Sequence, residues 1–221
     1  MSSINNEQPI IWLVDENLDE LRTYHKTLKK LMPTSVEVRD ISAYPLLDDY
    51  LPILEEPRTA CIITDQKLKV TGIATYTGIE LAKFLRKINS KIPIYILTNF
   101  PDDEEFIGGE WSVEDIIKKS ELNDEDERLI LVARIQRHIN VYEDIRGERE
   151  ERFNYLLNKS LNSDLDNSEL QELEALGLQR TAPNLTRELT QIKQMGEVVR
   201  AHEELMEQLK HYSHMEKDDA V

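Results

Sequence analysis

The chain has 221 residues, which is enough for one domain of ordinary size and a smaller addition. Hydrophobic residues make up 40% of it, so it can build a core, and its net charge of −16 argues against nucleic-acid binding, which needs a basic surface. No apolar run approaches the roughly 20 residues of a membrane-spanning helix, and the single cysteine, Cys61, cannot form an internal disulfide. We therefore expect a protein of the reducing cytoplasm that binds neither nucleic acid nor membranes.

Five strand-like segments occur in the first 120 residues. Apolar runs predict strands over 10–14, 60–65 and 92–97, and a shorter one over 113–117. The alternation around Val36 and Val38 predicts another strand over 36–41.

Amphipathic segments separate these strands. The leucines that follow the first strand predict a helix that stops at Pro33, and a helix over 78–88 follows the third strand. Between the second and third strands, Pro45 and Pro52 predict a short or irregular helix. Alternating strands and helices at this spacing predict a parallel sheet built from right-handed crossovers.

Four of the strands finish in polar residues, in the order Asp15–Glu16, Asp65, Thr98 and Lys118–Lys119. The carboxyl ends of parallel strands share one edge of the sheet, and ligands bind at that edge. Carboxylates suit Mg²⁺, whereas hydroxyl and ammonium groups suit phosphoryl oxygens. The sequence therefore predicts a site that combines a metal with a phosphoryl group.

The chain is helical in character after residue 123. A long helix is expected over 124–161, and its charged stretch 146–152, which contains Gly147, is either a solvated linker or a two-stranded coiled-coil segment with a break. The polar run that contains Asp164 and Asp166 lacks the glycine and final glutamate of a calcium loop, so a capped turn is expected there.

Beyond this turn we expect a short helix that ends at Gly177, a second break at 181–183, and a last amphipathic helix. The region from 147 onward has nine Lys and Arg against sixteen Asp and Glu, which argues against a DNA-binding output helix. His202 on the last helix faintly resembles a phosphotransfer histidine, but an ordinary surface histidine is the favoured interpretation.

The order and spacing of five short motifs resemble the receiver domain of two-component response regulators. These motifs are Val14–Asn17, Ile63–Asp65, Gly78–Leu81, Leu97–Thr98 and Asp115–Lys119. The resemblance implies a flavodoxin-like, doubly wound α/β fold with a five-stranded parallel sheet, followed by an α-helical C-terminal extension. It places the receiver domain at 8–145, a helical linker at 146–162, a small helical interaction or dimerisation region at 163–213 and a flexible tail at 214–221.

The resemblance also implies a role for each site residue. Asp65 would accept a phosphoryl group from a histidine kinase or a phosphotransfer protein, and Thr98 and Lys119 would bind its oxygens, with Lys118 as the competing lysine. The Mg²⁺ ligands would be Asp15, Glu16, Asp65 and the backbone carbonyl of Lys67. Such a protein is a signalling phosphoacceptor rather than an enzyme, although it would slowly lose its phosphoryl group to water.

Four departures from the family pattern affect how a signal would be transmitted. Ser120 stands where a proline usually follows the active lysine, and Ile116 replaces an aromatic residue. The loop over 66–77 is long, and Pro101 with the two glycines at 108–109 predicts only a short fourth helix.

Several functions remain open on the sequence alone. The protein could act on a downstream protein partner, serve as a phosphate sink, or be a pseudo-receiver scaffold that binds partners through its C-terminal helices without being phosphorylated. A hydrolase ranks low because Lys67 stands where some aspartate-based phosphatases place an acid. The helices suggest a homodimer, but packing within a monomer is equally compatible with the sequence.

Overall fold

The computed structural model describes the backbone of residues 8–101, 106 and 110–218, and their side chains as far as 206 with the exception of that of 110. Among these residues no helix is both long enough and apolar enough to cross a membrane.

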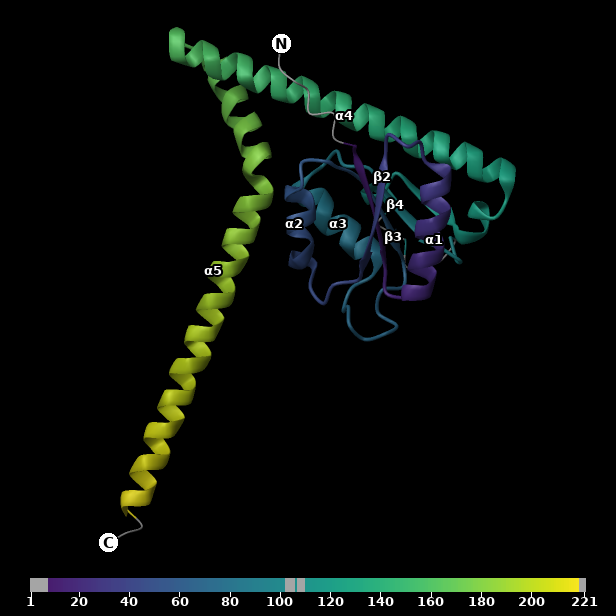
Figure 1. Ribbon diagram of the computed structural model, residues 1–221. Helices are drawn as coiled ribbons and strands as arrows, with labels where there is room; N and C mark the ends of the chain where they lie inside the picture. The colour runs from purple at the N-terminus through teal and green to yellow at the C-terminus, as the bar shows by residue number, and fades with distance from the viewer. Residues whose placement is uncertain (1–7, 102–105, 107–109, 219–221) are drawn as a thin grey trace. The chain divides into compact units, whose positions relative to one another are not determined.

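A five-stranded parallel sheet forms the centre of the N-terminal domain (Figure 1). Its strands are β1 (Ile10–Asp15), β2 (Glu37–Ser42), β3 (Thr59–Asp65), β4 (Ile94–Thr98) and β5 (Asp115–Lys118). The order across the sheet is β2-β1-β3-β4-β5, and every neighbouring pair is parallel. This is the flavodoxin-like order, so the predicted fold is confirmed.

Burial explains why these segments form strands. Every residue of β3 and β4 is buried, as expected for central strands covered on both faces by helices. The edge strand β2 is buried only at Val38 and Ile41, and its other residues are half-buried or exposed. The predicted strands are confirmed, although β4 and β5 begin two residues later than expected.

Three shorter helices flank the sheet. Helix α1 (Leu18–Leu31) lies on one side of it, and α2 (Leu51–Glu55) and α3 (Gly78–Ile88) lie on the other (Figure 1). A 3-10 turn, η1 (Leu47–Tyr50), precedes α2, as the prolines in this segment predict. Helix α3 has the predicted bounds, and a reciprocal capping box between Thr77 and Glu80 begins it.

The connection between β4 and β5 lies only partly within the described residues. It includes a 3-10 turn, η3 (Glu110–Ser112), and the buried side chain of Phe106. The short fourth helix predicted for this segment falls largely on residues 102–105 and 107–109, which lie outside the described ones.

Helix α4 (Glu125–Asn162) is unbroken over 38 residues. Its first half packs into the core of the domain through Leu131, Ile135, Ile139 and Tyr142, which are all buried. The helix continues through Gly147, so the charged stretch 146–152 contains no break.

A capped turn joins α4 to α5 (Asn167–Asp218). The amide of Glu169 donates to the Asp166 side chain at 2.8 Å, and the amide of Asp166 donates to the Glu169 side chain at 3.1 Å. This reciprocal pattern confirms the interpretation as a capped turn. Arg152 of α4 then binds Glu172 of α5 through two hydrogen bonds of 3.0 and 2.7 Å.

Two predictions about α5 are wrong. The helix does not end at Gly177, and it continues through Pro183 instead of breaking at 181–183. Proline removes one backbone hydrogen bond from a helix, and here the carbonyl that loses its partner belongs to the exposed Gln179, where solvent can replace the bond. The segment expected as a tail from 214 is helical as far as Asp218.

The chain divides into two compact units, Met1–Pro183 and Asn184–Val221. The first unit contains the sheet, α4 and the beginning of α5, and the second contains the remainder of α5. The domain boundaries that the sequence analysis places after 145, 162 and 213 stay predictions.

Gly78 at the beginning of α3 offers a test of this packing. A Cβ atom at this position would lie 2.2 Å from the backbone oxygen of Asp65, and a backbone atom cannot move away cheaply. We predict that Gly78→Ala lowers the free energy of unfolding by about 1–3 kcal/mol, the usual cost of overpacking. Urea unfolding of the full chain would measure it.

Gly147→Ala is the matched control, because Gly147 lies within α4 and a Cβ atom there would meet nothing within 4 Å. This substitution should raise the free energy of unfolding by about 0.5–1 kcal/mol through helix propensity. Equal effects of the two substitutions would contradict the close approach of α3 to β3.

Candidate functional site

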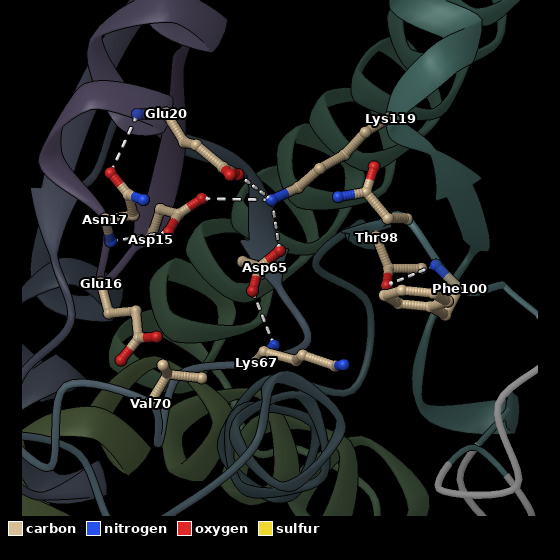
Figure 2. A pocket seen from close by; sticks show the side chains of 11 residues that line it. Asp15, Glu16, Asn17, Glu20, Asp65, Lys67, Val70, Thr98, Phe100 and Lys119 are labelled. Carbon is tan, nitrogen blue, oxygen red and sulfur yellow. Dashed lines mark hydrogen bonds and ion pairs between the residues drawn. The ribbon is translucent and has the colours of Figure 1, made fainter.

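The carboxyl ends of four strands converge on one pocket, as the sequence predicts (Figure 2). Asp15 ends β1, Asp65 ends β3, Thr98 ends β4, and Lys119 directly follows β5. The pocket has a volume of about 200 Å³. Its lining residues are Asp15, Glu16, Asn17, Glu20, Asp65, Lys67, Val70, Thr98, Asn99, Phe100 and Lys119.

Each carboxylate oxygen of Asp65 has a partner that fixes its position. Its Oδ1 atom lies 2.7 Å from Nζ of Lys119, and its Oδ2 atom accepts a hydrogen bond of 2.6 Å from the backbone N–H of Lys67. The side chain is only 9% exposed. A buried carboxylate is stable as an ion only when it is paired in this way.

Lys119, and not Lys118, is the lysine that reaches Asp65. Its side chain is 7% exposed, whereas Lys118 is exposed and its backbone N–H donates to Glu121. A 3-10 turn, η4 (Lys119–Leu122), begins at this residue and turns the chain after β5. The Lys119–Ser120 peptide bond is trans, so Lys119 reaches the pocket without the cis-proline bond typical of the family pattern.

Three carboxylates surround the ammonium group of Lys119. It contacts Asp65, lies 3.7 Å from Asp15, and forms a short hydrogen bond with Glu20 (Figure 2). Burial alone would lower the pKa of Lys119, but the hydrogen bonds to Asp65 and Glu20 and the nearby charges raise it above its usual value. Lys119 is therefore a permanent cation in this pocket.

The ionisation of Asp15 is shifted by its surroundings. Burial raises the pKa of Asp15 from 3.8 to about 6, and the charge of Asp65 adds to the shift although the N–H of Asn17 opposes it. That N–H donates to Oδ1 of Asp15 at 2.8 Å. A second cation near Asp15 would favour its ionised form.

Glu16 lines the pocket, and its role as a metal ligand stays a prediction. Its Oε2 atom accepts hydrogen bonds from the N–H and the hydroxyl of Thr71, at 2.8 and 3.0 Å. Glu16 thereby ties the long loop over 66–77 to the end of β1. It lines the pocket, but other carboxylates lie closer together.

Glu20, which the sequence analysis does not name as a ligand, lies in an acidic cluster with Asp15 and Asp65. Ligand atoms of Asp15, Glu20 and Asp65 all lie within 4.8 Å of one another. Sequence reasoning missed Glu20 because it lies inside the first turn of α1. Its carboxylate binds Lys119, which lies 99 residues later in the chain, so no local pattern predicts this contact.

The cluster has the donor set that Mg²⁺ requires. Magnesium takes oxygen ligands and keeps several waters, so two or three protein carboxylates suffice. Three carboxylates against one ammonium leave an excess of negative charge that favours a divalent cation. Lys67 lies in the pocket wall, and the role of its carbonyl as a further ligand stays a prediction.

Thr98 is buried at the end of β4 and faces the same pocket. Its Oγ1 atom accepts a hydrogen bond of 3.1 Å from the backbone N–H of Phe100. Because the hydroxyl acts here as an acceptor, its proton remains as a donor for an oxygen in the pocket. On the wall of the pocket, Nζ of Lys67 lies 4.4 Å from the ring centre of Phe100.

Ile116 occupies the position where the family pattern has an aromatic residue. It is partly buried and packs against a small apolar cluster of Ile79, Ile96 and Phe106. An aliphatic side chain in this cluster cannot make the ring rotation that couples the site to the surface in the family pattern.

Neither a family model nor a curated protein matches the sequence. Solved structures that match include the signal receiver domain of an HD domain-containing protein from Pseudomonas fluorescens Pf-5, at 17% identity over 66% of this chain and 97% of that one, with a TM-score of 0.49. The BeF3-activated DrrB receiver domain matches at 20% identity, 60% and 98% coverage and a TM-score of 0.44. TrrA from Thermotoga maritima, in complex with Mg²⁺ and BeF, matches at 17% identity, 55% and 99% coverage and a TM-score of 0.41.

The strand order, rather than these similarities, identifies the fold of the domain. The chain has the flavodoxin-like fold that receiver domains have, with an α-helical extension at its C-terminal end.

Magnesium binding should depend on the ionisation of Asp15. Its raised pKa of about 6 means that the carboxyl is ionised above this pH and protonated below it. Because the metal binds the ionised form, we predict that affinity for Mg²⁺ falls about tenfold between about pH 7 and pH 5. Calorimetric titration at several pH values would measure this dependence.

Asp15→Asn is the control for this assignment. The variant should bind Mg²⁺ more weakly at neutral pH and should lose the step near the pKa of Asp15. An affinity in the unmodified protein that stays constant across this range would contradict the assignment of Asp15 as a ligand.

Proposed function

We propose that this protein is a phosphoacceptor of a phosphorelay and that Asp65 receives the phosphoryl group. The observation that carries the proposal is the buried carboxylate of Asp65, which is paired at 2.7 Å with the ammonium of Lys119 in a pocket lined by further acids. A carboxylate can act as a nucleophile toward phosphorus when cations offset the charge of the incoming group.

The donor would be a phosphohistidine on a histidine kinase or a phosphotransfer protein. An oxygen of Asp65 would attack the phosphorus atom, the bond from phosphorus to the histidine nitrogen would break, and the electron pair would return to the imidazole. Thr98 would donate its hydroxyl proton to one phosphoryl oxygen, and Lys119 would pair with another. Asp15, Glu20 and Asp65 would hold Mg²⁺, which supplies positive charge for the transferring group.

We further propose that the phosphorylated protein acts through protein contacts or as a phosphate sink, and not through DNA. The acidic balance of the C-terminal helices supports this proposal. The aliphatic side chain of Ile116 supports the role of a phosphate sink. It replaces the aromatic ring whose rotation would transmit phosphorylation from the pocket to the protein surface. The buried, unpaired Cys61 is compatible with the cytoplasm as the compartment.

The phosphoryl group would be lost again by reaction with water. Lys67 stands two residues after Asp65, where an aspartate-based phosphatase would need an acid. Lys67 contacts the Phe100 ring, and both residues line the pocket, where they would control the access of water. We therefore propose a signalling acceptor rather than an enzyme.

The second candidate function is a pseudo-receiver scaffold. One observation favours it: Glu20 binds the ammonium of Lys119, which a phosphoryl group would need. Phosphorylation would then have to displace Glu20 from Lys119. In a scaffold the hydrogen bond between Glu20 and Lys119 would only stabilise the pocket. Partners would then bind the C-terminal helices of a monomer or of a homodimer.

Incubation with acetyl phosphate and Mg²⁺, followed by intact-mass measurement, separates these two functions. We predict that the protein gains the mass of one phosphoryl group, that the gain requires Mg²⁺, and that Asp65→Ala abolishes it. A folded protein that gains no mass under these conditions would support the scaffold.

Neighbouring lysines provide a matched pair for the same experiment. Lys119→Met should slow phosphorylation about 100-fold or more, because it removes the cation that offsets the phosphoryl charge. Lys118→Met should react at the rate of the unmodified protein, because Lys118 is exposed. Equal rates for the two variants would contradict the role given to Lys119.

A further inference from the structure

Glu20 differs from the other two carboxylates of the acidic cluster in the way it is held. The carboxylates of Asp15 and Asp65 each accept a hydrogen bond from a backbone N–H, at 2.8 and 2.6 Å. The carboxylate of Glu20 is instead bound by a side chain, that of Lys119 (Figure 2). The side chain of Glu20 is 39% exposed, whereas those of Asp15 and Asp65 are 5% and 9% exposed. Glu20 is therefore the member of the cluster that has room to move.

The bond between Glu20 and Lys119 conflicts with the binding of a phosphoryl group. The ammonium of Lys119 contacts Asp65 at 2.7 Å and Glu20, and both partners are anions. A phosphoryl oxygen on Asp65 would need the same ammonium, and the Glu20 carboxylate beside it would repel it. Lys119 can pair fully with a phosphoryl oxygen only after Glu20 has left it.

A second position for the Glu20 carboxylate lies within reach. Its ligand atom lies within 4.8 Å of those of Asp15 and Asp65, which are the carboxylates that would hold the cation. Magnesium prefers carboxylate oxygens and carries twice the charge of an ammonium group. The backbone N–H of Glu20 is fixed by the side chain of Asn17 at 3.3 Å, so a rotation of the Glu20 side chain suffices and the helix α1 stays in place.

We propose that Glu20 exchanges partners, binding Lys119 in the metal-free pocket and turning to Mg²⁺ when this ion binds. The exchange frees Lys119 for a phosphoryl oxygen. Glu20 is then a positioning residue, which keeps Lys119 occupied until the cation is in place. This inference rests on the Mg²⁺ site of the proposed function, but it does not require phosphoryl transfer.

The exchange makes Lys119 and Mg²⁺ competitors for the same carboxylate. By reciprocity, the factor by which Mg²⁺ weakens the bond between Glu20 and Lys119 is the factor by which this bond weakens the binding of Mg²⁺. A double-mutant cycle over the two residues measures that factor on the affinity for Mg²⁺.

Calorimetric titration of the full chain with Mg²⁺, at a pH well above the pKa of Asp15, tests the proposal. Lys119→Met should lower the Kd for Mg²⁺ at least about tenfold more in the presence of Glu20 than in the Glu20→Gln background, since a hydrogen bond between charged groups is lost only in the first case. Equal effects in the two backgrounds would overturn the proposal, because Glu20 would then stay on Lys119 when the metal binds.

Asp19→Asn is the matched control for Glu20→Gln. It removes the same charge from the same turn of α1, but the side chain of Asp19 is 95% exposed and pairs with Arg22. Glu20→Gln should raise the Kd for Mg²⁺ about tenfold, and Asp19→Asn should change it less than about twofold. Equal effects would overturn the proposal, because Glu20 would then act only through its general charge. This comparison retains Lys119, so it decides the question even if Lys119→Met does not fold.

The metal titrations and the acetyl phosphate experiment can fail separately. A protein that shows this coupling but gains no phosphoryl group would retain the exchange at Glu20 and lose the proposed function. A protein that is phosphorylated on Asp65 but shows no coupling would lose only the exchange.

Discussion

The ion pair between Asp65 and Lys119 is the interaction on which the rest of the site depends. A buried carboxylate without a partner would be costly, and Lys119 lowers this cost for Asp65 and, at a longer distance, for Asp15. With Glu20 the pocket still holds more carboxylates than cations. The structure therefore keeps an excess of negative charge at a point where a divalent cation and a phosphoryl group could both be accommodated.

Several elements of the fold serve to hold that pair in position. The central strand β3 is buried along its whole length, which fixes the backbone of Asp65. Gly78 allows the beginning of α3 to lie directly against this backbone, and the amide of Lys67 orients the carboxylate from the other side. Lys119 is brought in by the turn that follows β5. The burial that fixes the positions of the site residues also raises the pKa of Asp15. Keeping this carboxylate buried costs stability, and it favours the binding of a cation in the pocket.

The sequence was sufficient to predict the strands of the sheet and most residues of the pocket. Its polar strand ends predicted which residues would meet, because parallel strands share a carboxyl edge, and Asp15, Asp65, Thr98 and Lys119 do meet there. It was insufficient for Glu20, whose position depends on how the first turn of α1 packs against the pocket. It was also insufficient for α5, where local signals at Gly177 and Pro183 predicted breaks that the helix tolerates. In both cases the outcome depended on surroundings that a local pattern does not contain.

The most direct test of the central claim is fluorine NMR of the protein with Mg²⁺ and beryllofluoride, which mimics a phosphoryl group on an aspartate. If the Asp65 pocket is built to hold a phosphoryl group, bound fluorine resonances should appear only when Mg²⁺ is present and should be absent from Asp65→Ala. A folded protein that gives no bound resonance at saturating Mg²⁺ would contradict the account. The ion pairs of the pocket would then only stabilise the fold of a scaffold that is not phosphorylated.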